Sequence, residues 1–326
     1  MVNRFCTEGH VSRQPIAASW ISRRREPMDR GAFGSPPTSF GSGGGGADRG
    51  GFPGCLHLRF EHGVAGLFVA CGAVEFSALN LVGYRAVVRA AVEEVGNAVL
   101  VVAGVGYSLG LARDFAAVPK KEGARRLLLL PHGFLEAPQD TLIASVERIL
   151  EDIGLRTLVY QRGVARLVDQ SVLRIQLVLE LIGLKDGNSE FVGLRIVALF
   201  VYQDFLFFIG FLTGYINLRA YASIGITPYS SSAASCTPEI ACTFFRKTRE
   251  ADNSVLNRLL SEFLSPLVAL RDSLPGYAVS LIKVTAFMRV QRVGPVRTPL
   301  LDPQGEDLAE LEPIVRHGLA TVGAGI

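Results

Sequence analysis

Lysine and histidine are scarce in this chain of 326 residues, and each scarcity limits the chemistry available to it. The five histidines show no metal-ligand spacing such as H-E-x-x-H, so we expect no metal centre. Only five of the 33 basic residues are lysines. Each of these few amines can therefore be judged by its own position: they are Lys120, Lys121, Lys185, Lys247 and Lys283.

Paired cysteines and a basic surface stripe are also missing. The five cysteines form no C-x-x-C pair and no even disulfide set, which argues against a secreted disulfide scaffold and favours a reducing cytoplasm. Charged residues follow the arginines at 23–25, where an export signal would need an apolar segment. With a net charge of +3 and no stripe of basic residues that could follow a phosphate backbone, the chain is not expected to bind nucleic acid.

One apolar run, from Val197 to Ile216, approaches the length of a membrane span. Gln203 and Asp204 lie at its middle, where a charge is costly in lipid. We therefore expect no contact with a membrane. The run instead predicts a buried helix that leads into a strand, with Asp204 in the turn between them.

The amino-terminal region contains little that could form a core. Residues 1–30 have no apolar periodicity and are expected to be disordered. The segment Gly41–Gly51 is rich in glycine and is expected to form a loop.

From Val64 onward, short apolar runs alternate with longer segments of helical spacing. The runs start 19 to 33 residues apart, which suits the length of one strand-helix unit. The predicted strands are Gly66–Ala70, Val99–Ala103, Leu127–Leu130, Thr157–Tyr160, Leu181–Leu184, Phe205–Ile209 and Ile224–Thr227.

An eighth strand is predicted ahead of the glycine-rich segment, at Gly31–Pro36. An open doubly wound sheet also alternates strands and helices, but eight units favour a closed (β/α)8 TIM barrel, an α/β fold, over residues 31–235. A C-terminal helical region follows over residues 236–326. Its predicted helices are Pro238–Glu250, Ser254–Arg271, Tyr277–Val290 and Gly305–His317.

Only one lysine, Lys185, ends a predicted strand, and in a barrel of this kind the chemistry lies at the carboxyl ends of the strands. Partial burial there lowers the pKa of an amine and prepares it to attack a carbonyl carbon. Tyr160 ends the preceding predicted strand and could move protons during such an attack. A solvated lysine and a tyrosine that merely packs are the structural alternatives, and the pairing of the two positions favours the catalytic interpretation.

Two further loops at the predicted strand ends carry polar or glycine-rich patterns. Gly104–Gly110 contains three glycines, but the third comes one place late for a dinucleotide-binding motif, so rim turns explain them better. Ser230 and Ser231 follow the last predicted strand and offer hydroxyls that could hold a carboxylate, although a plain polar loop would look the same.

Several stretches together resemble the dihydrodipicolinate synthase and N-acetylneuraminate lyase superfamily, and within it the 5-dehydro-4-deoxyglucarate dehydratase family. The similarity covers residues 61–112, 157–187 and 223–300. Its motifs include Gly183-Leu184-Lys185-Asp186-Gly187, Tyr229-Ser230-Ser231, Pro238-Glu239-Ile240-Ala241, Ala269-Leu270-Arg271-Asp272 and Gly294-Pro295-Val296-Arg297. Several of these lie in the C-terminal region, where a shared active-site chemistry alone would not produce them.

The resemblance implies a barrel with a C-terminal helical domain, a homotetramer, and a reaction without metal or organic cofactor. It implies a cytoplasmic lyase that converts a small keto-diacid, 5-dehydro-4-deoxy-D-glucarate, to 2,5-dioxopentanoate, water and carbon dioxide. Lys185 matches the imine-forming lysine of the family and Tyr160 its proton-relaying tyrosine. Arg162, Ser230 and Ser231 are candidate substrate-binding residues, together with the loop Gly72-Ala73-Val74.

The sequence departs from the family pattern at two places near the expected site. The substrate-carboxylate loop, Gly-Thr-Gly-Glu in the family, reads Gly72-Ala73-Val74-Glu75 here, and Gly163 stands where the family has aspartate after Arg162. Two alternatives to the dehydratase remain. One is a pyruvate-dependent aldolase or synthase of the same superfamily, which would also use Lys185 and Tyr160. The other, to which these changes point, is an impaired member that serves as a binding or structural subunit.

Overall fold

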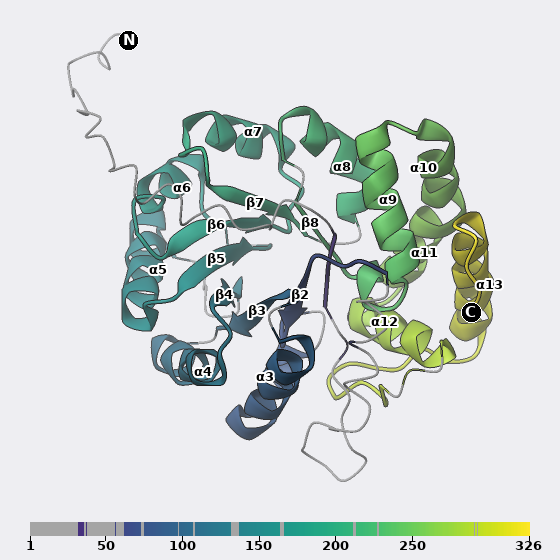
Figure 1. The fold of residues 1–326 in the computed structure, drawn as a ribbon, viewed down its shortest axis with the longest axis horizontal. Coiled ribbons are helices and arrows are strands. Elements are labelled where there is room, and N and C mark those ends of the chain that lie inside the picture. Colours follow the sequence, from purple (N-terminus) through teal and green to yellow (C-terminus); the bar gives the residue numbers. More distant parts are fainter. Residues whose placement is uncertain are drawn as a thin grey trace.

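Eight parallel strands form a closed barrel, and helices surround it (Figure 1). The computed structural model describes residues 32–35, 37, 56, 62–72, 75–96, 98–106, 108–131, 137–163, 166–210, 213–226, 228–289, 291 and 293–326. Each strand pairs with its neighbours in sequence, and β1 also pairs with β8, which completes the closure. The predicted fold class, a (β/α)8 barrel followed by helices, is confirmed.

Most strands lie where the apolar runs predicted them. The eight are β1 (Ala32–Gly34), β2 (Gly66–Val69), β3 (Leu100–Val105), β4 (Arg126–Leu129), β5 (Arg156–Gln161), β6 (Leu181–Asp186), β7 (Leu206–Ile209) and β8 (Tyr229–Ser231). Because nearly all their residues are buried, most of these strands read as continuous apolar runs, as expected for a parallel sheet that is covered on both faces.

The last strand was placed wrongly by the apolar pattern. Residues 224–226, the described part of the predicted strand Ile224–Thr227, form the turn that follows α8 (Thr213–Ser223). The true strand, β8, contains two serines, and its register pairs Phe33 with Ser230 and Gly34 with Ser231. Hydroxyl side chains on a strand of the barrel interior leave no apolar signal, so the buried residue Ile226 in the preceding turn dominated the pattern.

Most of the outer helices bury one apolar face against the barrel. They are α3 (Leu81–Val95), α4 (Leu109–Glu122), α5 (Gln139–Ile153), α6 (Asp169–Ile175), α7 (Phe191–Phe200) and α8. In α3, for example, Tyr84, Val88 and Ala91 lie along one buried face, while Arg89 and Glu93 form an exposed i,i+4 ion pair on the other.

Helix α7 differs from the expectation of a buried helix. As predicted, it leads through a turn containing Asp204 into β7. Leu194 is buried, but Val192, Leu199 and Phe200 have exposed fractions of 71%, 73% and 66%. Its polar positions are too few to cover the outer face, so an almost wholly apolar helix presents apolar side chains on both sides. Among the described residues no helix has the length and apolarity needed to cross a membrane.

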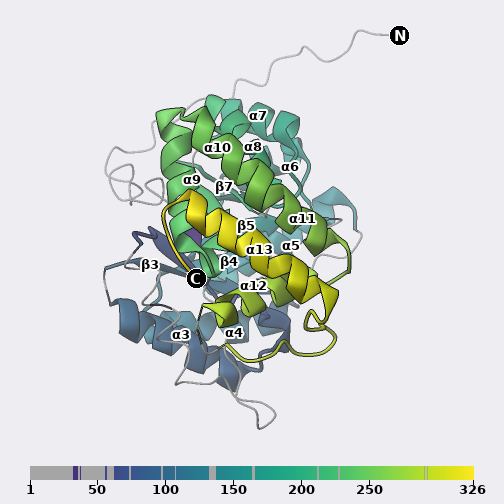
Figure 2. The same cartoon turned by 90° about the vertical axis from the view of Figure 1, so that its right-hand side faces the viewer.

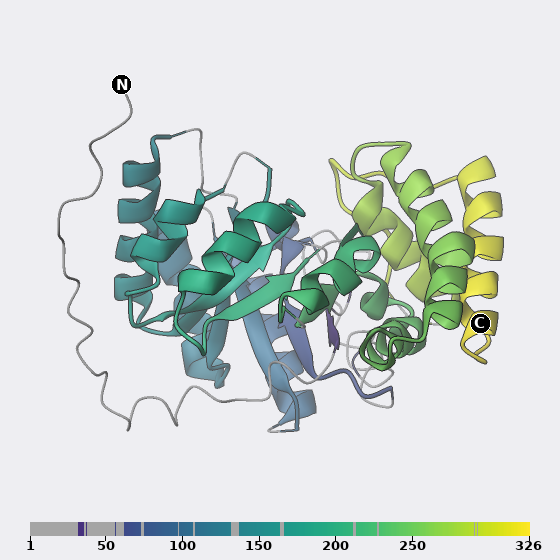
Figure 3. The same cartoon turned by 90° about the horizontal axis from the view of Figure 1, so that it is seen from above.

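The C-terminal helices form a separate layer beside the barrel (Figures 2 and 3). Pro238–Glu250 forms α9, which agrees with the predicted bounds. The predicted helix Ser254–Arg271 is α10 (Asn253–Leu259) and α11 (Ser265–Asp272), joined by a π-helical turn, η5 (Leu260–Leu264). Then come α12 (Tyr277–Met288) and α13 (Glu306–Thr321). The domain limits at 31–235 and 236–326 stay predictions, as does the homotetramer, and residues 1–30 and 41–51 lie outside the described residues.

Three phenylalanines fill the interior of the barrel. The ring centroids of Phe33, Phe68 and Phe208, from β1, β2 and β7, lie 5.0 to 5.6 Å apart. Gly66 makes room for them, because a Cβ atom at this position would lie 2.0 Å from the Phe33 ring. The cluster forms an apolar floor below the carboxyl ends of the strands.

Candidate active site

Lys185 points into the barrel from β6 and is only 7% exposed. Its Nζ donates a hydrogen bond of 2.9 Å to Ser230 Oγ on β8. It also lies 4.4 Å from the centroid of the Phe68 ring and 4.7 Å from that of the Tyr160 ring. The amine is therefore held between two aromatic faces and one hydroxyl, with almost no access to water.

Burial lowers the pKa of Lys185 from its ordinary value to about 8. The positive charge of Arg162 lowers it further, and Cys71 is the group with the opposite influence. Because burial raises the pKa of the Cys71 thiol to about 12, that thiol is uncharged while the lysine titrates. Among the described residues no anionic group is then a cause that raises this pKa, so part of Lys185 is neutral near physiological pH.

Tyr160 lies beside Lys185, as the strand-end positions predicted. The two residues are paired in register across β5 and β6. Burial raises the pKa of the Tyr160 phenol, while the nearby Arg162 acts against this, so the phenol stays protonated. Gly187 leaves space for the ring, since a Cβ atom there would lie 2.7 Å from Tyr160 Cε2.

Lys185 and Tyr160 open into a pocket at the carboxyl ends of the strands. Of the substrate-binding residues predicted from the sequence, Gly72, Arg162 and Ser230 line this pocket. Ala73 and Val74 lie outside the described residues. The other lining residues are Ser35, Cys71, Leu128, Ser232, Arg271, Ala278, Val279 and Ile282.

Ser231 is placed differently from Ser230. Its hydroxyl forms a hydrogen bond with the Tyr215 hydroxyl and accepts one of 2.9 Å from the Ala234 backbone N–H. These contacts hold the end of β8, and Ser231 is not among the residues that line the pocket, where Ser232 is present instead. Alternate residues of a strand point to opposite faces, so neighbouring serines take different roles.

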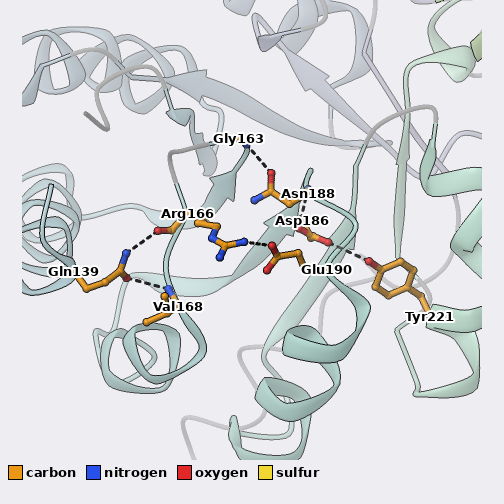
Figure 4. A network of polar contacts seen from close by, with 8 residues as sticks. All are labelled: Gln139, Gly163, Arg166, Val168, Asp186, Asn188, Glu190 and Tyr221. Atoms are coloured by element: carbon orange, nitrogen blue, oxygen red, sulfur yellow. Dashed lines mark hydrogen bonds and ion pairs between the residues drawn. The ribbon is translucent and has the colours of Figure 1, made fainter. Parts of the chain in front are cut away.

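A polar network supports the loops that follow β5 and β6 (Figure 4). Gly163 donates its backbone N–H to Asn188 Oδ1 at 2.6 Å, with a φ of +61° that glycine tolerates. Asp186 accepts hydrogen bonds from the Asn188 backbone N–H at 3.0 Å and from the Tyr221 hydroxyl at 3.1 Å. The glycine that departs from the family pattern thus joins two loops and does not line the pocket.

The same figure shows a second part of this network, around Arg166. Arg166 forms an ion pair with Glu190 at the start of α7. Gln139 accepts a hydrogen bond of 2.9 Å from the Val168 backbone N–H and donates one of 3.0 Å to the Arg166 carbonyl. These contacts tie α5, α6 and α7 together behind the strand ends.

A buried ion pair connects the Gly72 loop to the C-terminal helices. Lys283 of α12 donates 2.7 Å to Glu75 Oε2 and 2.8 Å to the Pro295 carbonyl. The other Glu75 oxygen accepts the Arg297 backbone N–H at 2.7 Å. The side chains of Lys283 and Glu75 are 2% and 1% exposed, respectively. Sequence reasoning missed this pair, because it links residues 208 positions apart.

The fold and the pocket define this chain as a (β/α)8-barrel protein with a buried amine at the carboxyl ends of its strands. It belongs to the dihydrodipicolinate synthetase family, whose model matches residues 37–318. The family resemblance inferred from the sequence motifs is thereby confirmed.

The chain is similar to named proteins in both sequence and fold. A probable 5-dehydro-4-deoxyglucarate dehydratase 2 of Streptomyces avermitilis is 42% identical over 95% of this chain and 93% of its own length. A probable 5-dehydro-4-deoxyglucarate dehydratase of Paracidovorax citrulli is 32% identical over 88% of this chain and 95% of its own. The crystal structure of dihydrodipicolinate synthase from Oceanobacillus iheyensis matches with a TM-score of 0.80 at 20% identity, over 88% of this chain and 96% of that one.

Replacing Lys283 by methionine removes the cation from the buried pair and leaves Glu75 without it. An uncompensated buried charge of this kind is expected to destabilise the fold by about 3–5 kcal/mol. The free energy of unfolding, measured by urea titration, checks this. Lys247→Met is the matched control, because Lys247 also pairs with carboxylates, Glu250 and Asp252, but at the surface. Equal losses for the two variants would contradict the role assigned to the buried pair.

Proposed function

We propose that this protein is a Schiff-base lyase that dehydrates and decarboxylates 5-dehydro-4-deoxy-D-glucarate to 2,5-dioxopentanoate. The observation that carries the proposal is the buried amine of Lys185, whose pKa of about 8 lies far below that of an ordinary lysine. The relatives named for this reaction cover nearly the whole chain and support it. The proposal includes a cytoplasmic location in sugar-diacid breakdown.

The reaction begins with an attack of the neutral Lys185 amine on the ketone carbon of the substrate. At pH 7 a pKa of about 8 leaves about 10% of the amine neutral, several hundred times the share of an ordinary lysine. Water must leave the carbinolamine to form the imine. Tyr160, a protonated phenol whose ring lies against the amine, is placed to supply the proton for this step.

The protonated imine then drives the dehydration. It withdraws electrons from the neighbouring methylene carbon, so that a proton can be removed there and the hydroxyl on the next carbon can depart as water. Loss of one carboxylate as carbon dioxide and hydrolysis of the imine complete the stoichiometry and return the amine.

The pocket suits an anionic substrate. Among the described residues that line it, the charged side chains are Lys185, Arg162 and Arg271, and none is acidic. Ser35, Ser230 and Ser232 add hydroxyls at the same rim. A keto-diacid carries two negative charges, which these groups can neutralise without a metal ion.

Product analysis tests the function directly. With 5-dehydro-4-deoxy-D-glucarate, one carbon dioxide and one 2,5-dioxopentanoate should form per substrate, as followed by nuclear magnetic resonance. Borohydride during turnover should attach the substrate to Lys185, as located by peptide mass mapping, and Lys185→Arg should abolish both signals. Carbon-carbon bond formation from pyruvate and an aldehyde would instead identify an aldolase, and an adduct without turnover would identify a binding protein.

The pKa of Lys185 predicts the pH dependence. The amine reacts when neutral, so kcat/KM should rise with pH and level off above about 8, and at pH 6 it should be about 100-fold lower than on the plateau. Arg162→Gln should move this limb to higher pH, because the arginine helps to lower the pKa. A pH profile that is the same for both proteins would contradict this account of the lowered pKa.

Gly210 tests the placement of the amine. A Cβ atom at this position would lie 2.8 Å from Lys185 Cε, so Gly210→Ala should displace the side chain. A shift of about 1 Å can cost about 100-fold in rate, and we expect kcat to fall by about 10- to 100-fold with little change in melting temperature. Gly110→Ala, where a Cβ atom meets nothing within 4 Å, is the control and should keep full activity. Unchanged kcat in Gly210→Ala would show that the precise position of the amine does not matter.

A further inference from the structure

The C-terminal helices contribute a cation to the pocket that holds Lys185. Arg271 lies on α11, outside the barrel, yet it lines this pocket and its side chain is only 5% exposed. Nothing in its sequence position indicated this, because it neither ends a strand nor follows one. Its placement at the barrel mouth requires the helical layer seen beside the barrel in Figure 3.

We propose that Arg271 binds the carboxylate at the far end of the substrate, away from the ketone that reacts with Lys185. This inference rests on the proposed function, because it names how the same pocket recognises a diacid. A guanidinium can hold a carboxylate through two parallel hydrogen bonds, which fixes orientation as well as charge.

The contacts of Arg271 hold its guanidinium in a fixed direction. Its Nε and one terminal nitrogen donate hydrogen bonds of 2.7 Å each to the two carboxylate oxygens of Asp272. This bidentate contact uses one edge of the guanidinium. The Asp272 side chain is 61% exposed, so the carboxylate of this pair lies at the surface while the arginine side chain is buried beside the pocket.

The surroundings of Arg271 strengthen such an interaction. Val279 and Ile282 of α12 line the same pocket and supply an apolar wall beside it. An ion pair gains strength where apolar groups exclude water, because the local dielectric constant is lower.

The charges of the pocket divide between the two ends of the ligand. Arg162 acts on the pKa values of Lys185 and Tyr160, so it belongs to the reacting end. While Lys185 is neutral, Arg162 and Arg271 are the charged groups among the described lining residues. These two cations then face the two carboxylates of a keto-diacid. Because Arg162 belongs to the reacting end, the carboxylate at the far end is left to Arg271.

Two ligands of equal length separate this role from a structural one. 2-Oxoadipate is a six-carbon keto-diacid, and 2-oxohexanoate has a methyl group in place of its far carboxylate. Neither carries a leaving hydroxyl, so each should stop at an imine that borohydride reduces onto Lys185. The concentration that gives half-maximal trapping measures the affinity for each ligand.

Arg271→Met should raise the half-maximal concentration of 2-oxoadipate by about 10- to 100-fold, the usual effect of losing a charged hydrogen-bond partner, and leave that of 2-oxohexanoate unchanged. Arg271→Lys should give an intermediate loss, because lysine keeps the charge but not the fork, and it supports the test if the methionine variant folds poorly. Arg258→Met on α10, an exposed arginine paired with Glu262, controls for the change in net charge and should affect neither ligand.

The outcomes separate the inference from the proposed function. Equal weakening of both ligands by Arg271→Met and Arg271→Lys would show a structural role and overturn the inference, as would no weakening of either. If the unmodified protein trapped neither ligand on Lys185, the proposed function would fail and the inference with it.

Discussion

The pairing of β1 with β8 is the contact on which the rest of the structure depends, because it closes the barrel. β1 contains only three residues, yet its register sets Phe33 opposite Ser230 and joins the first strand to the last. In an open sheet, β2 and β6 would be separated by three strands. Closure brings them face to face across the interior, so that Phe68 of β2 lies 4.4 Å from Lys185 Nζ of β6. The amine and the loop after β2 thus share one pocket only because a strand of three residues completes the circle.

The pKa of the amine follows from opposing effects within that enclosure. Desolvation favours the neutral form, since a buried ammonium loses its hydration. Two aromatic faces and the Ser230 hydroxyl recover part of this loss for the protonated form, through cation–π contact and a hydrogen bond. A nearby carboxylate would have raised the pKa far more, but the acid that follows Lys185, Asp186, bonds instead to Asn188 and Tyr221. Adjacent strand residues point to opposite faces, so the aspartate is kept out of the interior while the lysine stays in it.

Sequence reasoning identified the residues whose positions follow from the regular alternation of strands and helices. Lys185 and Tyr160 end consecutive strands, and the rule that chemistry lies at the carboxyl ends of barrel strands was enough to pair them. The apolar pattern failed to locate β8, because the serines of that strand leave no apolar signal and a neighbouring turn supplied one. It could not separate the inward Ser230 from Ser231, since that choice depends on the register of a single residue. Sequence reasoning could not identify Arg271 and Lys283 for another reason. The packing of helices brings these residues to their partners and to the pocket, and no local pattern encodes that packing.

The two residues that local pattern could not identify give the C-terminal helices a part in the site. Lys283, which lies on α12, forms an ion pair with Glu75 next to the Gly72 loop. Arg271 reaches the pocket from α11. Lys185, Tyr160 and Ser230 all belong to barrel strands, so the residues proposed to act at the ketone are supported by the sheet. A small shift of the helical layer would therefore alter how a ligand's far end is held while leaving the amine and its neighbours in place. Under the proposed function, substrate choice and imine chemistry thus depend on different layers of the same fold, and substitutions in the helices should change the first without disturbing the second.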